Sequence, residues 1–158
     1  PWQEFLVRRL TTSNFLFWLA VKVGRDQMIG TLLATDPDLV DESTPIERRR
    51  ANRILDEIMP VARRSKGMLN DATLAGHPAR ADFSKISVPT LVISVADDRF
   101  GTAATARDIA AAIPQSRLVI YPQGGHIWIG HDQDLWREVA RFIGGIEGLP
   151  PHVDTRSR

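Results

Sequence analysis

The sequence predicts an α/β protein in which a helical N-terminal region precedes a short parallel βαβα unit. Three observations support this prediction. Apolar residues recur at helical spacing over the first part of the chain. Two uninterrupted, β-branched runs, TLVISVA and RLVIY, then follow. The sequence returns to helical patterns between and after these runs, as the crossover connections of parallel strands require.

Residues 1–84 are expected to form the helical region and a linker. The stretch SNFLFWLAVKVG has a helix cap at Ser13 or Asn14, an apolar body and a stop at Gly24. The stretch DQMIGTLLA continues in helical form until TDPD interrupts it.

The clearest helix signal lies in TPIERRRANRILDEIMP. Thr44 is expected as the N-cap, with Pro45 at the first helical position and Glu47 closing a capping box. The apolar residues at helical spacing, which predict a buried stripe, are Ile46, Ala51, Ile54, Leu55 and Ile58. Pro60 then opens another helix that ends near Gly76, before the linker.

Residues 85–148 are expected to hold the two strands, each buried on both faces, and two helices. The last helix, in DQDLWREVARFIGG, is expected to be capped near Asp132 or Asp134, and residues 149–158 form a tail. Two strands alone are rarely stable in water. The sheet is therefore expected to be incomplete, its open edge covered by a missing N-terminal half or by another copy of the chain.

The composition excludes several function classes. The 158 residues include 20 Lys+Arg and 19 Asp+Glu, a net charge of +1 that gives no argument for binding nucleic acid or an anionic membrane. The absence of cysteine excludes a thiolate metal site and a cysteine nucleophile, and it fits a cytoplasmic location. The apolar segment NFLFWLAVKVG is shorter than the ~18 residues that a membrane helix needs.

Two loops carry the residues best suited to chemistry. Asp97 and Asp98 follow the first predicted strand, and His126 follows the second. The carboxyl ends of adjacent parallel strands lie side by side, so these loops should meet, with the acid before the base in the chain. A metal pair made by His126 and His131 lacks a third ligand at suitable spacing, so no metal is expected.

The stretch ISVPTLVISVADDRFGTAATARDIAAAIPQSRLVIYPQGGH resembles the C-terminal third of an α/β-hydrolase-fold protein. The matching features are the strand entered through VPTLVI, the acid beyond its centre, the alanine-rich helix ending in IP, and RLVIYPQGGH. The helical region before it resembles, in position and helicity, the cap or lid that many members insert there. The resemblance therefore implies the C-terminal part of an α/β-hydrolase fold preceded by a helical cap.

This resemblance also implies roles for single residues. His126 matches the family's catalytic histidine and Asp98 its acid, with Asp97 as the alternative acid. The family's nucleophile sits in a Gly-x-Ser-x-Gly elbow, and no serine here has that context; Ser94, for example, lies within a strand. The nucleophile is therefore expected outside this chain, and this piece alone is expected to be inactive.

The activity implied is hydrolysis of an ester, amide or related bond in a small apolar molecule, without a cofactor. Trp18 and Trp128 are candidates for lining the substrate pocket. For Trp2, Phe15, Phe17 and Trp18, an ordinary helical core is the competing interpretation. A non-catalytic module, which uses the same fold to bind a ligand or a protein, is the alternative function.

Overall fold

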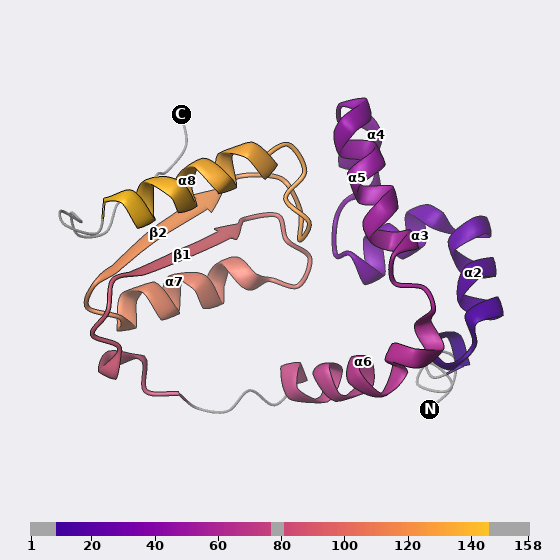
Figure 1. Cartoon of the computed structure of the whole chain (residues 1–158), viewed down its shortest axis with the longest axis horizontal. Helices are drawn as coiled ribbons and strands as arrows, with labels where there is room; N and C mark the ends of the chain where they lie inside the picture. The colour runs from indigo at the N-terminus through magenta and orange to yellow at the C-terminus, as the bar shows by residue number, and fades with distance from the viewer. Residues whose placement is uncertain (1–8, 77–80, 146–158) are drawn as a thin grey trace.

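The computed structural model describes residues 9–76 and 81–145, which form a group of helices followed by a pair of strands flanked by two helices (Figure 1). The elements are α2 (Asn14–Val23), α3 (Arg25–Leu32), α4 (Pro37–Glu42), α5 (Pro45–Asp56), α6 (Val61–Gly76), η1 (Phe83–Lys85), β1 (Thr90–Val95), α7 (Thr102–Ala112), β2 (Ser116–Tyr121) and α8 (Asp132–Gly144). Helices α2–α6 lie together, and the chain then crosses to the strands. The expectations for Trp2 and for the tail at 149–158 fall outside the described residues, and the boundary at residue 84 stays a prediction.

Polar side chains cap α2, α4 and α5 in the N-terminal region. The Ser13 hydroxyl accepts a hydrogen bond from Leu16 N (3.3 Å), and this confirms the predicted start of α2. Thr44 caps α5 in the same way, accepting from Glu47 N at 3.3 Å. The segment TDPD, predicted only as an interruption, instead starts α4, because Asp36 caps it and Pro37 occupies its first position.

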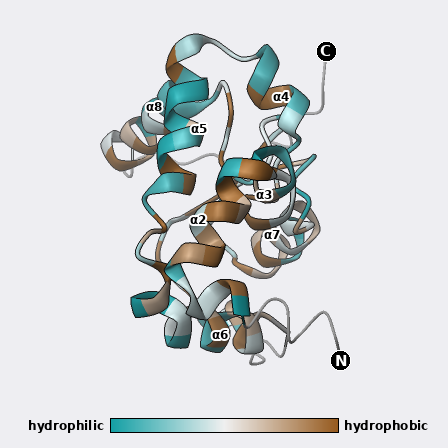
Figure 2. Ribbon diagram, turned by 90° about the vertical axis from the view of Figure 1, so that its right-hand side faces the viewer, coloured by the Kyte–Doolittle hydropathy of each residue, from teal (hydrophilic) through white to brown (hydrophobic). Residues whose placement is uncertain are grey.

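The principal core lies among the helices, and Figure 2 shows apolar residues along α2, whereas α5 is largely polar. Its buried members are Phe17, Val21, Ile29, Leu33, Val40, Ala51, Leu55, Val61, Ile127 and Ile129. The last two come from the loop that follows β2. The prediction for Ile46 was wrong: this residue is 70% exposed, because α5 turns Ala51 and Leu55 toward the core and leaves Ile46 outside.

The sheet consists of β1 and β2, paired in parallel from Thr90 opposite Ser116 to Val95 opposite Tyr121. Helix α7 packs on both strands, and α7 and α8 flank the pair (Figure 1). The expectation of strands buried on both faces is wrong for most of both strands, because only Ser94 and Val95 of β1 and only Ser116 and Leu118 of β2 are buried. Within the described sheet, β1 pairs on one side only, so its other edge carries unpaired backbone groups.

The N-cap of α8 lies one residue before Asp132, the earlier of the two cap positions that we expected. His131 occupies its N-cap, and neither Asp132 nor Asp134 does, because both lie inside the first turn. Their carboxylates are favourable there, since the helix dipole is positive at that end. Over the described residues, no helix has both the length and the apolar character needed to cross a membrane.

Candidate active site

The loop after β1, residues 96–101, buries a carboxylate; we call it the acid loop. The Asp98 side chain is 3% exposed. Its Oδ1 accepts a hydrogen bond from Phe100 N (2.8 Å), a local turn typical of aspartate. Its Oδ2 accepts from the hydroxyl of Thr102, the first residue of α7. Gly101, at φ +71°, makes the left-handed bend between them, so the loop geometry comes from local sequence.

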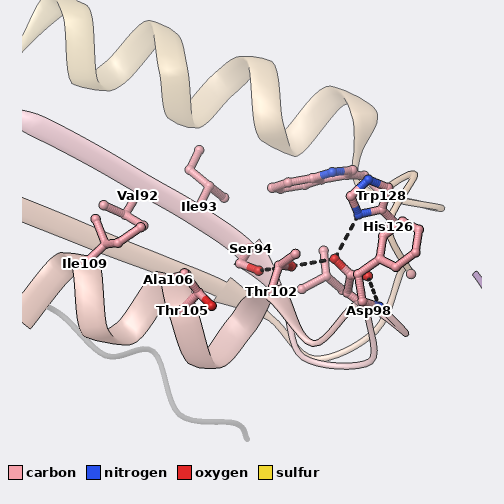
Figure 3. Close-up of a pocket in the computed structure, with 13 residues that line it drawn as sticks. Val92, Ile93, Ser94, Asp98, Thr102, Thr105, Ala106, Ile109, His126 and Trp128 are labelled. Atoms are coloured by element: carbon pink, nitrogen blue, oxygen red, sulfur yellow. Dashed lines mark hydrogen bonds and ion pairs between the residues drawn. The ribbon is translucent and has the colours of Figure 1, made fainter. Parts of the chain in front are cut away.

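The imidazole of His126 completes this cluster. Its Nδ1 lies 2.9 Å from Asp98 Oδ2, and Figure 3 shows the two side chains pointing toward one another at the ends of the strands. Burial raises the pKa of the Asp98 carboxyl, but the hydrogen bonds from Thr102, His126 and Phe100 lower it more, so the net pKa lies below its ordinary value. Asp98 is therefore an ionised acceptor near neutral pH.

An ionised carboxylate at Nδ1 fixes the tautomer of the ring. The proton of a neutral His126 sits on Nδ1 and is donated to Asp98, which leaves the lone pair on Nε2. The His126 side chain is 44% exposed, and Phe100 packs edge-on against it with ring centroids 4.8 Å apart. A buried acid thus orients a partly open base, the arrangement needed for general base catalysis.

The turn after β2, residues 124–130, places this histidine; we call it the base turn. Gly124 and Gly125 have φ of +140° and +60°, which favour glycine. Asp97 holds both: its Oδ1 accepts from Gly125 N (2.8 Å) and its Oδ2 from Gly124 N (3.2 Å). The structure thus brings Asp98 to the imidazole, whereas Asp97, the alternative acid, binds the backbone of the base turn.

The connection between α3 and α4 contacts both the acid loop and the base turn. Thr35, which is fully buried, lies under Gly125, where an added Cβ would come within 2.5 Å of its side chain. Its hydroxyl also accepts from Ile127 N (3.4 Å). On the acid loop, Arg99 N donates to Ala34 O (3.1 Å), and the Arg99 guanidinium pairs with Asp36 at 2.9 Å. The helical region therefore contacts the acid loop and the base turn through neighbouring residues.

A groove of about 400 Å³ runs from this cluster along β1 (Figure 3). Four consecutive strand residues, Val92–Val95, line it together with residues of α7, and consecutive residues share a groove only along the edge of a strand. Trp128 lines the groove beside His126, as expected of a pocket residue. Trp18 does not line it; this residue lies on α2 with 47% of its surface exposed.

Other sequence expectations have mixed outcomes. Phe17 is buried in the helical core, while Phe15 is 65% exposed. Ser94 lies in β1 as expected, and its hydroxyl is 2.9 Å from that of Thr102, at the end of the network away from His126. The residues that hold the site and that sequence reasoning missed are Thr35, Phe100 and Thr102. Only Thr102 gave a usable signal, a hydroxyl four positions after Asp98 at a helix start.

Among the described residues, no group of three His, Asp or Glu side chains is placed to hold a metal ion. His131, at the start of α8, stacks on Tyr121 with ring centroids 4.2 Å apart, away from the Asp98–His126 pair. The histidine that participates in the site is therefore His126.

Comparison with known proteins finds one matching family and relatives that match part of the chain. The profile of the family described as "alpha/beta hydrolase fold" matches residues 13–130. A protein of Klebsiella pneumoniae subsp. pneumoniae, named "Putative carbamate hydrolase RutD", is 42% identical over 76 residues, which cover 46% of this chain and 28% of that protein. The protein of the same name in Klebsiella variicola is 41% identical with the same coverage. The chain thus spans less than a third of the length of these relatives, and no solved structure matches it.

Proposed function

The chain belongs to the α/β hydrolase fold family, and on that basis we propose that it supplies the acid and the base of a hydrolase's catalytic triad. The observation that carries the proposal is the 2.9 Å contact between His126 Nδ1 and the buried, ionised Asp98. A buried carboxylate that orients a partly exposed imidazole is typical of a catalytic site.

In the proposed mechanism, His126 Nε2 takes the proton of a hydroxyl nucleophile as that oxygen attacks the substrate carbonyl. Asp98 keeps the ring in the reactive tautomer and stabilises the imidazolium that forms. The imidazolium then gives its proton to the leaving group, and water releases the acyl group by the same steps in reverse order. Thr102 and the backbone N–H of Phe100 hold the carboxylate in place throughout.

The nucleophile, in this proposal, comes from outside the 158 residues. Ser94 is unsuited to the role, because its hydroxyl is tied to Thr102 behind the acid. The groove along the unpaired edge of β1 leads directly to His126. We propose that a strand of the longer hydrolase occupies this edge and brings a serine to Nε2.

The proposed substrates are small carbonyl compounds with an ester, amide or carbamate bond. The relatives' printed name supports including carbamates. Phe100 and Trp128, which line the groove at the His126 end, support an apolar substrate there. No cofactor takes part in these steps.

The test is turnover of a nitrophenyl ester and a nitrophenyl carbamate by the longer protein that contains this chain. We expect His126→Ala to lower kcat/KM at least about 1,000-fold. The matched control is His131→Gln, which changes the other histidine near the base turn and should leave most of the turnover. The 158-residue chain alone should give none. Equal turnover in His126→Ala and the parent would refute the proposal and favour the non-catalytic binding module.

A further inference from the structure

Trp128 has a backbone conformation that large residues seldom adopt. Its φ is +63°, in the left-handed region, and it lies in the base turn two residues after His126. Such a residue persists only where the surrounding structure holds it there, and residues of this kind cluster at functional sites. The contacts around Trp128 therefore bear directly on the position of the base.

The strain at Trp128 has a structural reason. Its neighbours Ile127 and Ile129 are 8% and 6% exposed and belong to the helical core. Trp128 itself lines the groove with His126, and Figure 3 shows both side chains at the same end of that groove. The turn thus buries two isoleucines among the helices and presents the residue between them to the groove.

Two residues of α5 hold this turn through its main chain. Arg50 donates from Nη1 to Ile127 O (2.8 Å) and from Nη2 to Trp128 O (3.2 Å). Glu47 pairs with Arg50 at 2.6 Å and accepts a hydrogen bond from Gly130 N (3.1 Å). Both side chains are largely buried, and the fork of the guanidinium matches the two carbonyls and the carboxylate.

Glu47 is ionised and balances the positive charge of Arg50. Burial raises the pKa of Glu47, but the hydrogen bonds from Arg50 and Gly130 N lower it more, so the carboxyl is ionised at neutral pH. The carboxylate thus neutralises the guanidinium in its buried position. Of the capping box expected here, the bond from Glu47 N to the Thr44 hydroxyl forms, whereas the Glu47 side chain points to the base turn.

We propose that Glu47 and Arg50 are positioning residues for the base: they hold residues 127–130 so that Trp128 keeps its left-handed backbone and His126 stays against Asp98. They act through the main chain and contact neither the imidazole nor the acid. Helix α5 and the base turn then move as one unit. The inference rests on the proposed function only in giving His126 its role as the base.

The test uses the 158-residue chain and needs no turnover. Hydrogen exchange is measured at the Ile129 amide. This amide donates to Gly124 O (2.7 Å), so its hydrogen bond joins two residues of the base turn and involves no residue of α5. We expect Arg50→Met to speed this exchange about tenfold or more, and to weaken the NMR signal of the His126 Nδ1 proton. The matched control is Arg53→Met, which removes an exposed arginine of the same helix and should change neither signal.

A second comparison separates positioning from general stabilisation. Trp128→Gly removes the strain, because glycine tolerates positive φ. In that background Arg50→Met should speed exchange by less than about threefold, so the two substitutions should be clearly non-additive. If Arg50→Met does not fold, Glu47→Gln is measured in both backgrounds with the same expectation. An equal effect in both backgrounds, or none in either, would overturn the proposal. Failure of the longer protein to hydrolyse esters would remove the proposed function and leave this exchange result standing.

Discussion

The helical region and the strand pair bury their apolar residues to different degrees. Among the helices, Ala51, Leu55 and Val61 are completely buried in one continuous core. The strand pair shares with α7 a small cluster built on Ala106 and Ala110 of that helix and Leu118 of β2, and four of the six residues of β1 are only partly buried. The larger core therefore lies among the helices and is completed by Ile127 and Ile129 of the base turn, whereas the strands share only a small one.

This difference divides the site as well. The base turn packs its isoleucines into the helical core, whereas the acid loop continues from β1. The contact between Asp98 and His126 thus joins a well-packed region to a sparsely packed one. Both members of the pair follow strands, but the position of His126 depends on the packing of the base turn against the helices.

The largest effect should come from the helical core. Phe17→Ala removes a ring that is 2% exposed and should lower the free energy of unfolding by about 3–5 kcal/mol. Trp18→Ala, its neighbour on α2 with 47% exposure, should cost less than about 1 kcal/mol. Urea unfolding followed by circular dichroism measures both values. Similar costs for the two variants would contradict the proposed location of the core.

Gly125→Ala should separate the base turn from the helical region. The new Cβ would lie 2.5 Å from Thr35 and would sit at φ +60°, so we expect a cost of about 2–5 kcal/mol. Gly101→Ala is the matched control, because its φ is +71° with open space around it, and only the backbone cost of about 1–2 kcal/mol applies. Equal urea midpoints for the two variants would show that Thr35 does not support the turn.

Asp97→Ala should weaken the link between the acid loop and the base turn. It removes the acceptor of the Gly124 and Gly125 amides and should cost about 1–3 kcal/mol. Asp108→Ala, an exposed aspartate on α7, should stay within about 0.5 kcal/mol of the parent. Chemical unfolding of the parent and the two variants measures both costs. A silent Asp97→Ala would mean that the turn does not need this carboxylate.

The smallest effect should be a pH dependence from Asp98. Its pKa is lowered in the folded chain by the Thr102, His126 and Phe100 hydrogen bonds, which outweigh burial. Its contribution to stability is therefore complete above its ordinary pKa of 3.8 and is lost as the pH falls through the lower, folded value. Unfolding measured from about pH 6 to about pH 3 should depend less on pH in Asp98→Asn than in the parent. If the free energy of unfolding depended on pH equally in Asp98→Asn and the parent, this expectation would be contradicted. The control is Asp108→Asn, which changes an exposed aspartate.

Much of this architecture follows from local sequence signals. Thr44 and Pro45 start α5 where the capping pattern predicts. Likewise, Asp98 and His126 meet because they follow adjacent parallel strands, and topology places such strand ends side by side.

Contacts between distant residues could not be predicted in this way. Nothing in the local sequence places Thr35 beneath Gly125 or directs Arg50 to the carbonyls of Ile127 and Trp128. The failure at Ile46 has the same origin, since helical periodicity gives a stripe but only packing decides where its edge lies.

The central claim, that Asp98 orients His126 as a base, is tested most directly by the NMR signal of the His126 Nδ1 proton in the ¹⁵N-labelled chain. A proton held in a hydrogen bond to a buried carboxylate should appear far downfield and exchange slowly with water. We predict this signal in the parent and in Asp97→Asn, and its loss in Asp98→Asn. A signal that survives in Asp98→Asn, or that disappears only in Asp97→Asn, would contradict the assignment of Asp98 as the residue that orients the base.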